Sequence, residues 1–150
     1  MVSVLVLYHS QQHGNTEQMA RAVAEGAEAA GAEVTLHNAN NGRFDVERYR
    51  AYDAAAFGTP DYYSYLAGTL KVFLDDWYIA KRTHPTGLLD KPLALFFTHG
   101  GGGAVKRPLE QLFRRLGPQV GETIESLGAP SEAVLEACRA LGRQLAEAVE

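Results

Sequence analysis

Segments that favour strands alternate five times with segments that favour helices, and this alternation constrains the fold more than any other feature of the sequence. The predicted strands cover residues 2–7, 34–37, 54–58, 92–98 and 120–127. The first, third and fourth are apolar at almost every position, which is typical of strands buried on both faces. The pattern therefore predicts an α/β fold with a parallel sheet that is covered by helices on both sides.

Helical periodicity fills the intervals between these strands. A first helix is expected at residues 15–30, ending at Gly31. Its buried stripe consists of Thr16, Met19, Ala20, Val23, Ala27 and Ala30. Later helices are expected at residues 45–52, 66–79, 104–116 and after Ser131, with Pro108 constraining the first turn of the third of these. No repeat or linker interrupts the pattern, so residues 1–150 are interpreted as one domain.

Composition excludes several classes of protein. No apolar run approaches the roughly 18 residues of a membrane span, and no basic segment precedes the first strand as in a signal peptide, so a cytoplasmic protein is expected. The net charge is −4, with no basic patch among aromatic residues, which argues against nucleic acid as a partner. The single cysteine, Cys138, excludes an internal disulfide and is interpreted as an inert core thiol.

Residues 10–16, with the sequence Ser-Gln-Gln-His-Gly-Asn-Thr, have the composition of an anion-binding loop. The loop joins a buried strand to a helix N-terminus, where free amides and the helix dipole favour negative charge. Ser10 and Thr16 add hydroxyl donors, Asn15 adds an amide, and Gly14 permits close approach of the backbone. A phosphate monoester suits this loop. The same residue types also begin ordinary helices, so the loop alone leaves both interpretations open.

Two further unusual loops follow the third and fourth predicted strands, at the edge of the sheet where ligands bind in such folds. Residues 59–65 contain three tyrosines, which favour stacking on a flat ligand, although a lid or a subunit contact would also explain them. Four consecutive glycines at residues 100–103 suggest a backbone that lies against a ligand and donates amides to it. His99, at the entrance, is either a ligand contact or a turn residue bonded to the backbone.

Other ligand-binding motifs are absent from the sequence. It contains neither GxGxxG nor GxxxxGK[ST], so neither a dinucleotide-binding fingerprint nor a nucleoside triphosphatase loop is supported. His9 and His13 have the spacing of a metal pair but flank a turn and lack an evident third ligand, so no metal is expected. Gly58 ends the third strand where a phospho-acceptor receiver would need an aspartate.

Together the three loops resemble those of the flavodoxin superfamily, and the likeness covers nearly the whole chain. Residues 7–10 (Leu-Tyr-His-Ser) through Gly14-Asn15-Thr16 look like the FMN phosphate loop, although the spacing from Ser10 to Gly14 is one residue longer than in many flavodoxins. Residues 58–60 (Gly-Thr-Pro) with residues 67–75 are similar to the flavodoxin-like NAD(P)H:quinone reductases. The resemblance implies a five-stranded, doubly wound parallel sheet in the order 2-1-3-4-5.

The resemblance also implies FMN as the cofactor and assigns residues to it. The phosphate would be held by Ser10, Gln12, His13, Gly14, Asn15 and Thr16. The isoalloxazine ring would lie along Pro60, Asp61, Tyr62, Tyr63 and Ser64. The pyrimidine side of the ring would face His99, Gly100, Gly101 and Gly102. Thr59 and Thr98, at the starts of these two loops, are assigned to the cofactor as well. No lysine or arginine belongs to the phosphate loop, which leaves charge stabilisation to amides, hydroxyls and the helix dipole.

Three functions are compatible with this resemblance. The first is an enzyme that passes electrons from NAD(P)H to a quinone, and the second is a one-electron carrier that serves protein redox partners. The third is a binding module that has the flavin fold but no turnover. The modest net charge and the reductase-like second loop favour the enzyme, because carrier flavodoxins are generally more acidic.

Overall fold

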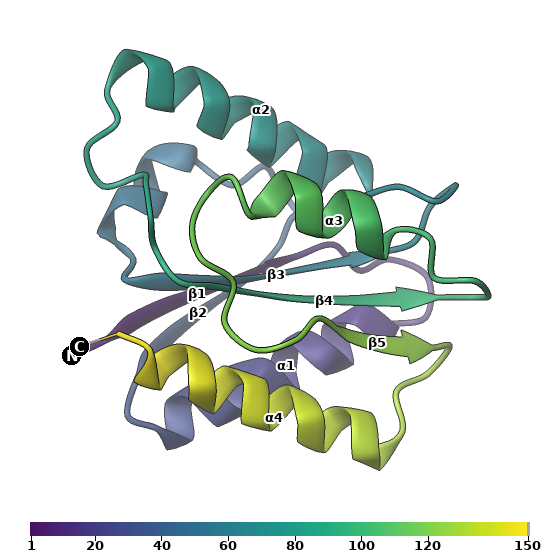
Figure 1. Ribbon diagram of the computed structural model, residues 1–150. Helices are drawn as coiled ribbons and strands as arrows, with labels where there is room; N and C mark the ends of the chain where they lie inside the picture. Colours follow the sequence, from purple (N-terminus) through teal and green to yellow (C-terminus); the bar gives the residue numbers. More distant parts are fainter. Residues whose placement is uncertain (150) are drawn as a thin grey trace.

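The computed structural model describes residues 1–149 and contains a five-stranded parallel sheet (Figure 1). Its strands are β1 (Ser3–Tyr8), β2 (Glu33–Asn38), β3 (Ala54–Pro60), β4 (Leu93–His99) and β5 (Ile124–Leu127). The helices are α1 (Asn15–Ala29), the 3₁₀ helix η1 (Val46–Ala51), α2 (Gly68–Thr83), α3 (Lys106–Phe113) and α4 (Glu132–Glu147). The strand order is β2-β1-β3-β4-β5, so the predicted topology is confirmed.

Both faces of the central strands are buried, as their continuous apolar sequences predict. Side chains alternate across a strand, so Val4 and Val6 of β1 pack on the side of α1 and α4, whereas Leu5 and Leu7 pack on the side of α2 and α3. Figure 1 shows the two pairs of helices on opposite sides of the sheet. Cys138 of α4 is fully buried, and this burial raises the pKa of its thiol to about 12, as expected of an inert core cysteine.

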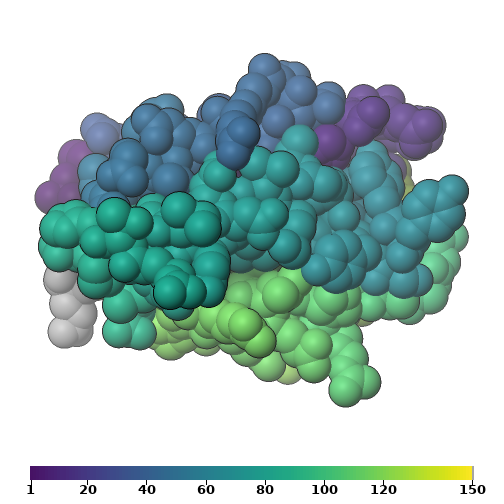
Figure 2. Space-filling model, turned by 90° about the horizontal axis from the view of Figure 1, so that it is seen from above, coloured from purple at the N-terminus to yellow at the C-terminus, as the bar shows by residue number. Residues whose placement is uncertain are grey.

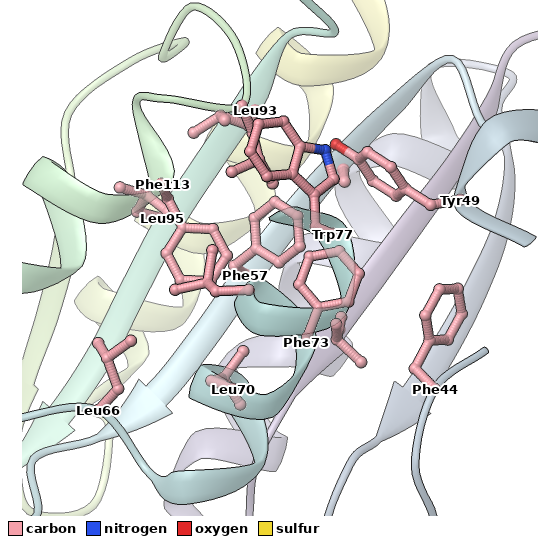
Figure 3. Packing of buried hydrophobic residues seen from close by; sticks show 14 of the residues in the cluster. Phe44, Tyr49, Phe57, Leu66, Leu70, Phe73, Trp77, Leu93, Leu95 and Phe113 are labelled. Carbon is pink, nitrogen blue, oxygen red and sulfur yellow. The ribbon is translucent and has the colours of Figure 1, made fainter. Parts of the chain in front are cut away.

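An aromatic cluster fills the side of the sheet that α2 and α3 cover (Figure 3). Phe57 of β3 lies at its centre, with ring centroids 4.4 Å from Phe113 of α3 and 5.5 Å from Phe73 of α2. Trp77 packs in the same cluster and donates its indole N–H to the carbonyl oxygen of Leu88 at 2.9 Å. These contacts join α2, α3 and β3 into one core, so the helices that follow β3 and β4 have fixed starting points.

Helices α1 and α4 pack together so closely that two positions have no room for a side chain. A Cβ atom at Gly26 would lie 1.8 Å from the carbonyl oxygen of Arg139, and one at Gly142 would lie 1.9 Å from that of Val23. Each glycine therefore lets its helix touch the backbone of the other. The close contact holds α1, whose N-terminus begins at the ligand-binding edge of the sheet, firmly against the rest of the fold.

Two predicted elements are longer than the observed ones by at least four residues. The predicted strand 120–127 is reduced to residues 124–127, because Gly121, with a φ of +67°, bends the chain between the isolated bridge of Gln119 with Leu93 and the start of β5. The predicted helix 104–116 is observed as the shorter helix α3, which covers residues 106–113. Pro108 fits its first turn, where a backbone N–H has no partner within the helix. Ser131 caps α4 as predicted, accepting a hydrogen bond from the Val134 amide at 3.2 Å.

We predict that Gly142→Ala lowers the free energy of unfolding by about 1–3 kcal/mol, because the added methyl group forces α1 and α4 apart. Gly68→Ala is the matched control, since a Cβ at Gly68 meets nothing within 4 Å and its φ is not positive. Urea unfolding monitored by circular dichroism gives both values. Equal stability of the two variants would contradict the close packing described here.

Candidate functional site

A pocket of about 270 Å³ lies at the carboxyl end of the sheet, between the loops that follow β1, β3, β4 and β5. Strand register brings these loops together, since Tyr8 pairs with Gly58 and Pro60 pairs with Thr98. Figure 2 shows the purple, teal and green segments of the first three loops together at one end of the molecule. The pocket is lined by Ser10, Gln11, Gln12, His13, Gly14, Asn15, Thr16, Pro60, Asp61, Tyr62, Thr98, His99, Gly100 and Gly128.

Helix α1 opens into this pocket without a side-chain cap. Gly14 occupies the N-cap position with a φ of +71°, and it can offer no side-chain acceptor to the amides of the first turn. The Glu17 amide donates instead to the Ser10 hydroxyl at 3.3 Å. The hydroxyls of Thr16 and Thr98 are 2.9 Å apart and link α1 to β4. The positive end of the α1 dipole therefore faces a space that hydroxyl and amide groups surround.

Asn38, the last residue of β2, fixes the first loop. Its Oδ1 accepts a hydrogen bond from the Ser10 amide at 3.1 Å, and its Nδ2 donates to the Ser10 carbonyl oxygen at 2.9 Å. The same Oδ1 also accepts from the Asn40 amide at 3.1 Å. Sequence analysis missed this role for two reasons. An asparagine before an Asn- and Gly-rich stretch is typical of the start of a loop, and Ser10, to which Asn38 bonds, lies 28 residues away in the sequence.

His9 connects the first loop to the second. The side chain is buried, with Nδ1 2.8 Å from the Thr69 hydroxyl and Nε2 2.7 Å from Oε1 of Gln11. The ring also meets Tyr62 edge to face, with centroids 5.8 Å apart. Since an amide carbonyl oxygen can only accept, Nε2 donates to Gln11, and Nδ1 shares a second hydrogen bond with the Thr69 hydroxyl. Both ring nitrogens are therefore occupied by neighbouring side chains.

The second loop is a tight turn that places only part of its predicted residues in the pocket. The backbones of Tyr62 and Tyr65 exchange hydrogen bonds at 3.0 and 3.1 Å, and Tyr63 and Ser64 between them have φ values of +55° and +64°. Tyr63 consequently points into solvent and is fully exposed. Pro60, Asp61 and Tyr62 line the pocket.

Three predicted residues of this loop, Thr59, Tyr63 and Ser64, do not line the pocket. The Thr59 hydroxyl is buried, accepts from the Ala67 amide at 3.0 Å and donates to the Pro60 carbonyl oxygen at 2.7 Å. The Ser64 amide donates to Asp61 Oδ1 at 2.8 Å, while Asp61 Oδ2 accepts from the Val105 amide at 3.2 Å. These contacts shape the turn and join it to the third loop.

The third loop contributes Thr98, His99 and Gly100 to the pocket, whereas Gly101 and Gly102 lie beyond the lining. A Cβ at any of the three glycines would meet nothing within 4 Å, so their backbone is open. His99 is held by Glu125 of β5, with Nε2 3.0 Å from Oε2. Gly128, which sequence analysis missed, joins the pocket because its amide donates to the His99 carbonyl oxygen at 2.8 Å.

The donor groups of the pocket fit a phosphorylated planar ligand such as FMN. Among the described residues that line it, none is lysine or arginine, so an anion would be held by the α1 amides and by the hydroxyls of Ser10 and Thr16. Tyr62 provides an aromatic ring to the pocket and Gly100 an open backbone. The Nδ1 atom of His99 is buried without a hydrogen-bond partner in the described part of the chain, as expected where a polar ligand completes a site.

Residues 1–149 give no indication of a metal site or of a membrane-spanning helix. These residues contain no group of three or more His, Cys, Asp or Glu side chains placed to hold a metal ion. Nor does any helix among them have the length and apolar character needed to cross a membrane.

Comparison with known proteins gives three findings. The family model for flavodoxins matches residues 6–142. An NAD(P)H dehydrogenase (quinone) from Brucella ovis is 41% identical over a match that covers 50% of this chain and 46% of that protein. The counterpart from Sinorhizobium fredii is 40% identical over the same shares. The chain thus spans about half the length of the curated relatives it matches.

Solved structures resemble this chain along almost its entire length. A flavodoxin from the domain Archaea superposes with a TM-score of 0.82 and 22% identity, covering 98% of both chains, which shows a shared fold. A flavodoxin, WrbA-like protein from Agrobacterium tumefaciens superposes with a TM-score of 0.81 and 25% identity, covering 99% of this chain and 97% of the other.

We predict that Asn38→Ala loosens the first loop and lowers the free energy of unfolding by about 1–3 kcal/mol, because two hydrogen bonds to Ser10 are lost. Amide hydrogen exchange at Ser10 should accelerate as well. Asn40→Ala is the matched control, since only the Asn40 backbone takes part in this network. Unchanged exchange at Ser10 in Asn38→Ala would show that another contact fixes the loop.

Proposed function

The chain belongs to the flavodoxin family, and we propose that its 150 residues form one FMN-binding redox domain that reduces quinones with electrons from NAD(P)H. One observation carries the proposal. The uncapped N-terminus of α1, the aromatic ring of Tyr62 and the open backbone of Gly100 line the same pocket at the carboxyl edge of the sheet. A phosphate and a flat ring are the two ligand parts that these groups suit.

The first loop would hold the phosphate of FMN. The amides of Asn15 and Thr16 lie in the first turn of α1, and the hydroxyls of Ser10 and Thr16 stand beside them. Asn38 keeps the loop in place through both hydrogen bonds to Ser10. Because no cation takes part, the affinity for phosphate would come from the helix dipole and from hydrogen bonds to a charged acceptor.

The second and third loops would orient the ring. Tyr62 is fixed by a T-shaped contact with the His9 ring and would stack on an aromatic ligand, while Pro60 holds the backbone where the loop leaves β3. Gly100 lines the same pocket, and its backbone amide would donate to the pyrimidine part of the ring. FMN, when bound, supplies the capacity to accept and release electrons, and the protein supplies position and polarity.

The quinone-reductase activity is supported by the names of the relatives, which are about 40% identical over a match that covers 46% of their length. The one-electron carrier has its own supporting observation. The match to the flavodoxin from the domain Archaea covers 98% of this chain and 98% of that flavodoxin. The third alternative, a binding module without turnover, would have the same pocket and no electron donor.

Anaerobic mixing with NADPH separates these alternatives. Purified protein is first titrated with FMN by calorimetry, where we expect about one FMN per chain. The loaded protein is then mixed with NADPH, and the loss of flavin absorbance is followed before and after addition of a soluble quinone. The enzyme predicts fast bleaching and quinone-dependent recovery. Absence of bleaching with NADPH or NADH, together with reduction by a protein donor, would favour the carrier, and absence of FMN binding would refute the proposal altogether.

A further inference from the structure

The buried side chain of His9 contacts three different segments of the site at once. Its Nε2 lies 2.7 Å from Oε1 of Gln11 in the first loop, and its Nδ1 lies 2.8 Å from the hydroxyl of Thr69 in the first turn of α2. Its ring meets the ring of Tyr62 in the second loop at 5.8 Å and an angle of 80°. The Tyr62 hydroxyl in turn lies 3.5 Å from the same Gln11 oxygen. His9, Gln11 and Tyr62 therefore form a closed triangle of side chains, which Thr69 anchors to α2.

Two corners of this triangle face the ligand and the third does not. Gln11 and Tyr62 line the pocket, whereas His9 is absent from its lining. Gln11 belongs to the loop that would hold the phosphate, and Tyr62 belongs to the loop that would lie along the flavin ring. Tyr62 is also the single phenylalanine, tyrosine or tryptophan among the described residues that line the pocket. His9 therefore supports both halves of the site without lining it.

The second loop depends on such support because its backbone is strained. Tyr63 and Ser64 have φ values of +55° and +64°, which residues with a Cβ atom adopt only where surrounding contacts hold them. Asp61 holds the backbone of the turn through hydrogen bonds to the Ser64 amide and to the third loop. His9 contacts the Tyr62 ring itself, so it bears directly on how that ring is presented to a ligand.

We propose that His9 is a positioning residue that couples the two halves of the site, so that the phosphate of FMN strengthens the contact of its ring with Tyr62. This inference rests on the proposed function, since it concerns FMN in the same pocket. A phosphate that fixes the first loop fixes Gln11, and the hydrogen bond from Gln11 holds His9 against Tyr62. Because coupling between two contacts is reciprocal, the ring strengthens the binding of the phosphate by the same factor.

The test measures one ratio, the affinity of the apoprotein for FMN divided by its affinity for riboflavin, by calorimetry. We expect Tyr62→Leu to lower this ratio about three- to tenfold, because the ring contact that the phosphate strengthens is lost. His9→Phe keeps a ring but loses both hydrogen bonds, so it should lower the ratio to a similar extent. The double variant H9F/Y62L should show no further fall. A merely structural role of His9 would weaken both ligands alike and leave the ratio unchanged.

His37→Phe is the matched control. His37 also has Nε2 2.7 Å from an oxygen, the carbonyl of Gly42, and its ring meets that of Phe44 at 5.4 Å and 79°, but it does not line the pocket or join its loops. The ratio should be unchanged in this variant. Thr69→Val removes only the hydroxyl beside Nδ1 of His9, and it decides the matter if His9→Phe does not fold. We expect Thr69→Val to lower the ratio about two- to threefold.

The outcomes separate this inference from the proposed function. An unchanged ratio in His9→Phe and Thr69→Val would overturn the inference, and the proposed function would stand because FMN still binds. Additive effects of His9→Phe and Tyr62→Leu would overturn it in the same way, as would an equal fall of the ratio in His37→Phe. Absence of FMN binding to the unaltered protein would refute the proposed function and this inference with it.

Discussion

The parallel pairing of β1 with both β2 and β3 determines where the other parts of this protein can lie. The chain leaves β1 towards β2 on one side and then returns to place β3 on the other, so the loops after β1 and β3 separate at the edge of the sheet. The pocket occupies this separation. Since β1 is buried on both faces, a one-residue change in its register would exchange Val4 and Val6 with Leu5 and Leu7 between the two cores and would displace the loop that follows β1.

The sequence was sufficient to predict the central part of the fold, because β1, β3 and β4 are continuously apolar and α1 has one clear stripe. It was less informative at the edge, where β5 has only four residues and Gly121 decides the boundary through a backbone conformation that composition does not reveal. Among the predicted site residues, Ser10, Gln12, His13, Gly14, Asn15 and Thr16 of the first loop all line the pocket. Tyr63 and Ser64 do not, because the positive φ angles of the turn direct them away from the pocket. Asn38 and Gly128 depend on contacts between distant segments, which no local pattern encodes.

Among the described residues that line the pocket, none is lysine or arginine, so an anion there would be held by amides and hydroxyls. Such groups need exact placement, and the first loop is fixed by Asn38 and by the Thr16–Thr98 contact.

The account depends most on the claim that the uncapped N-terminus of α1 binds a phosphate. The affinities of the unaltered protein for FMN and for riboflavin, which differ only in that phosphate, test it directly by calorimetry at one ionic strength. The account predicts that FMN binds at least about tenfold more tightly, as expected when charge-assisted hydrogen bonds are formed, and that Thr16→Ala reduces this difference. Equal affinities for FMN and riboflavin would contradict it.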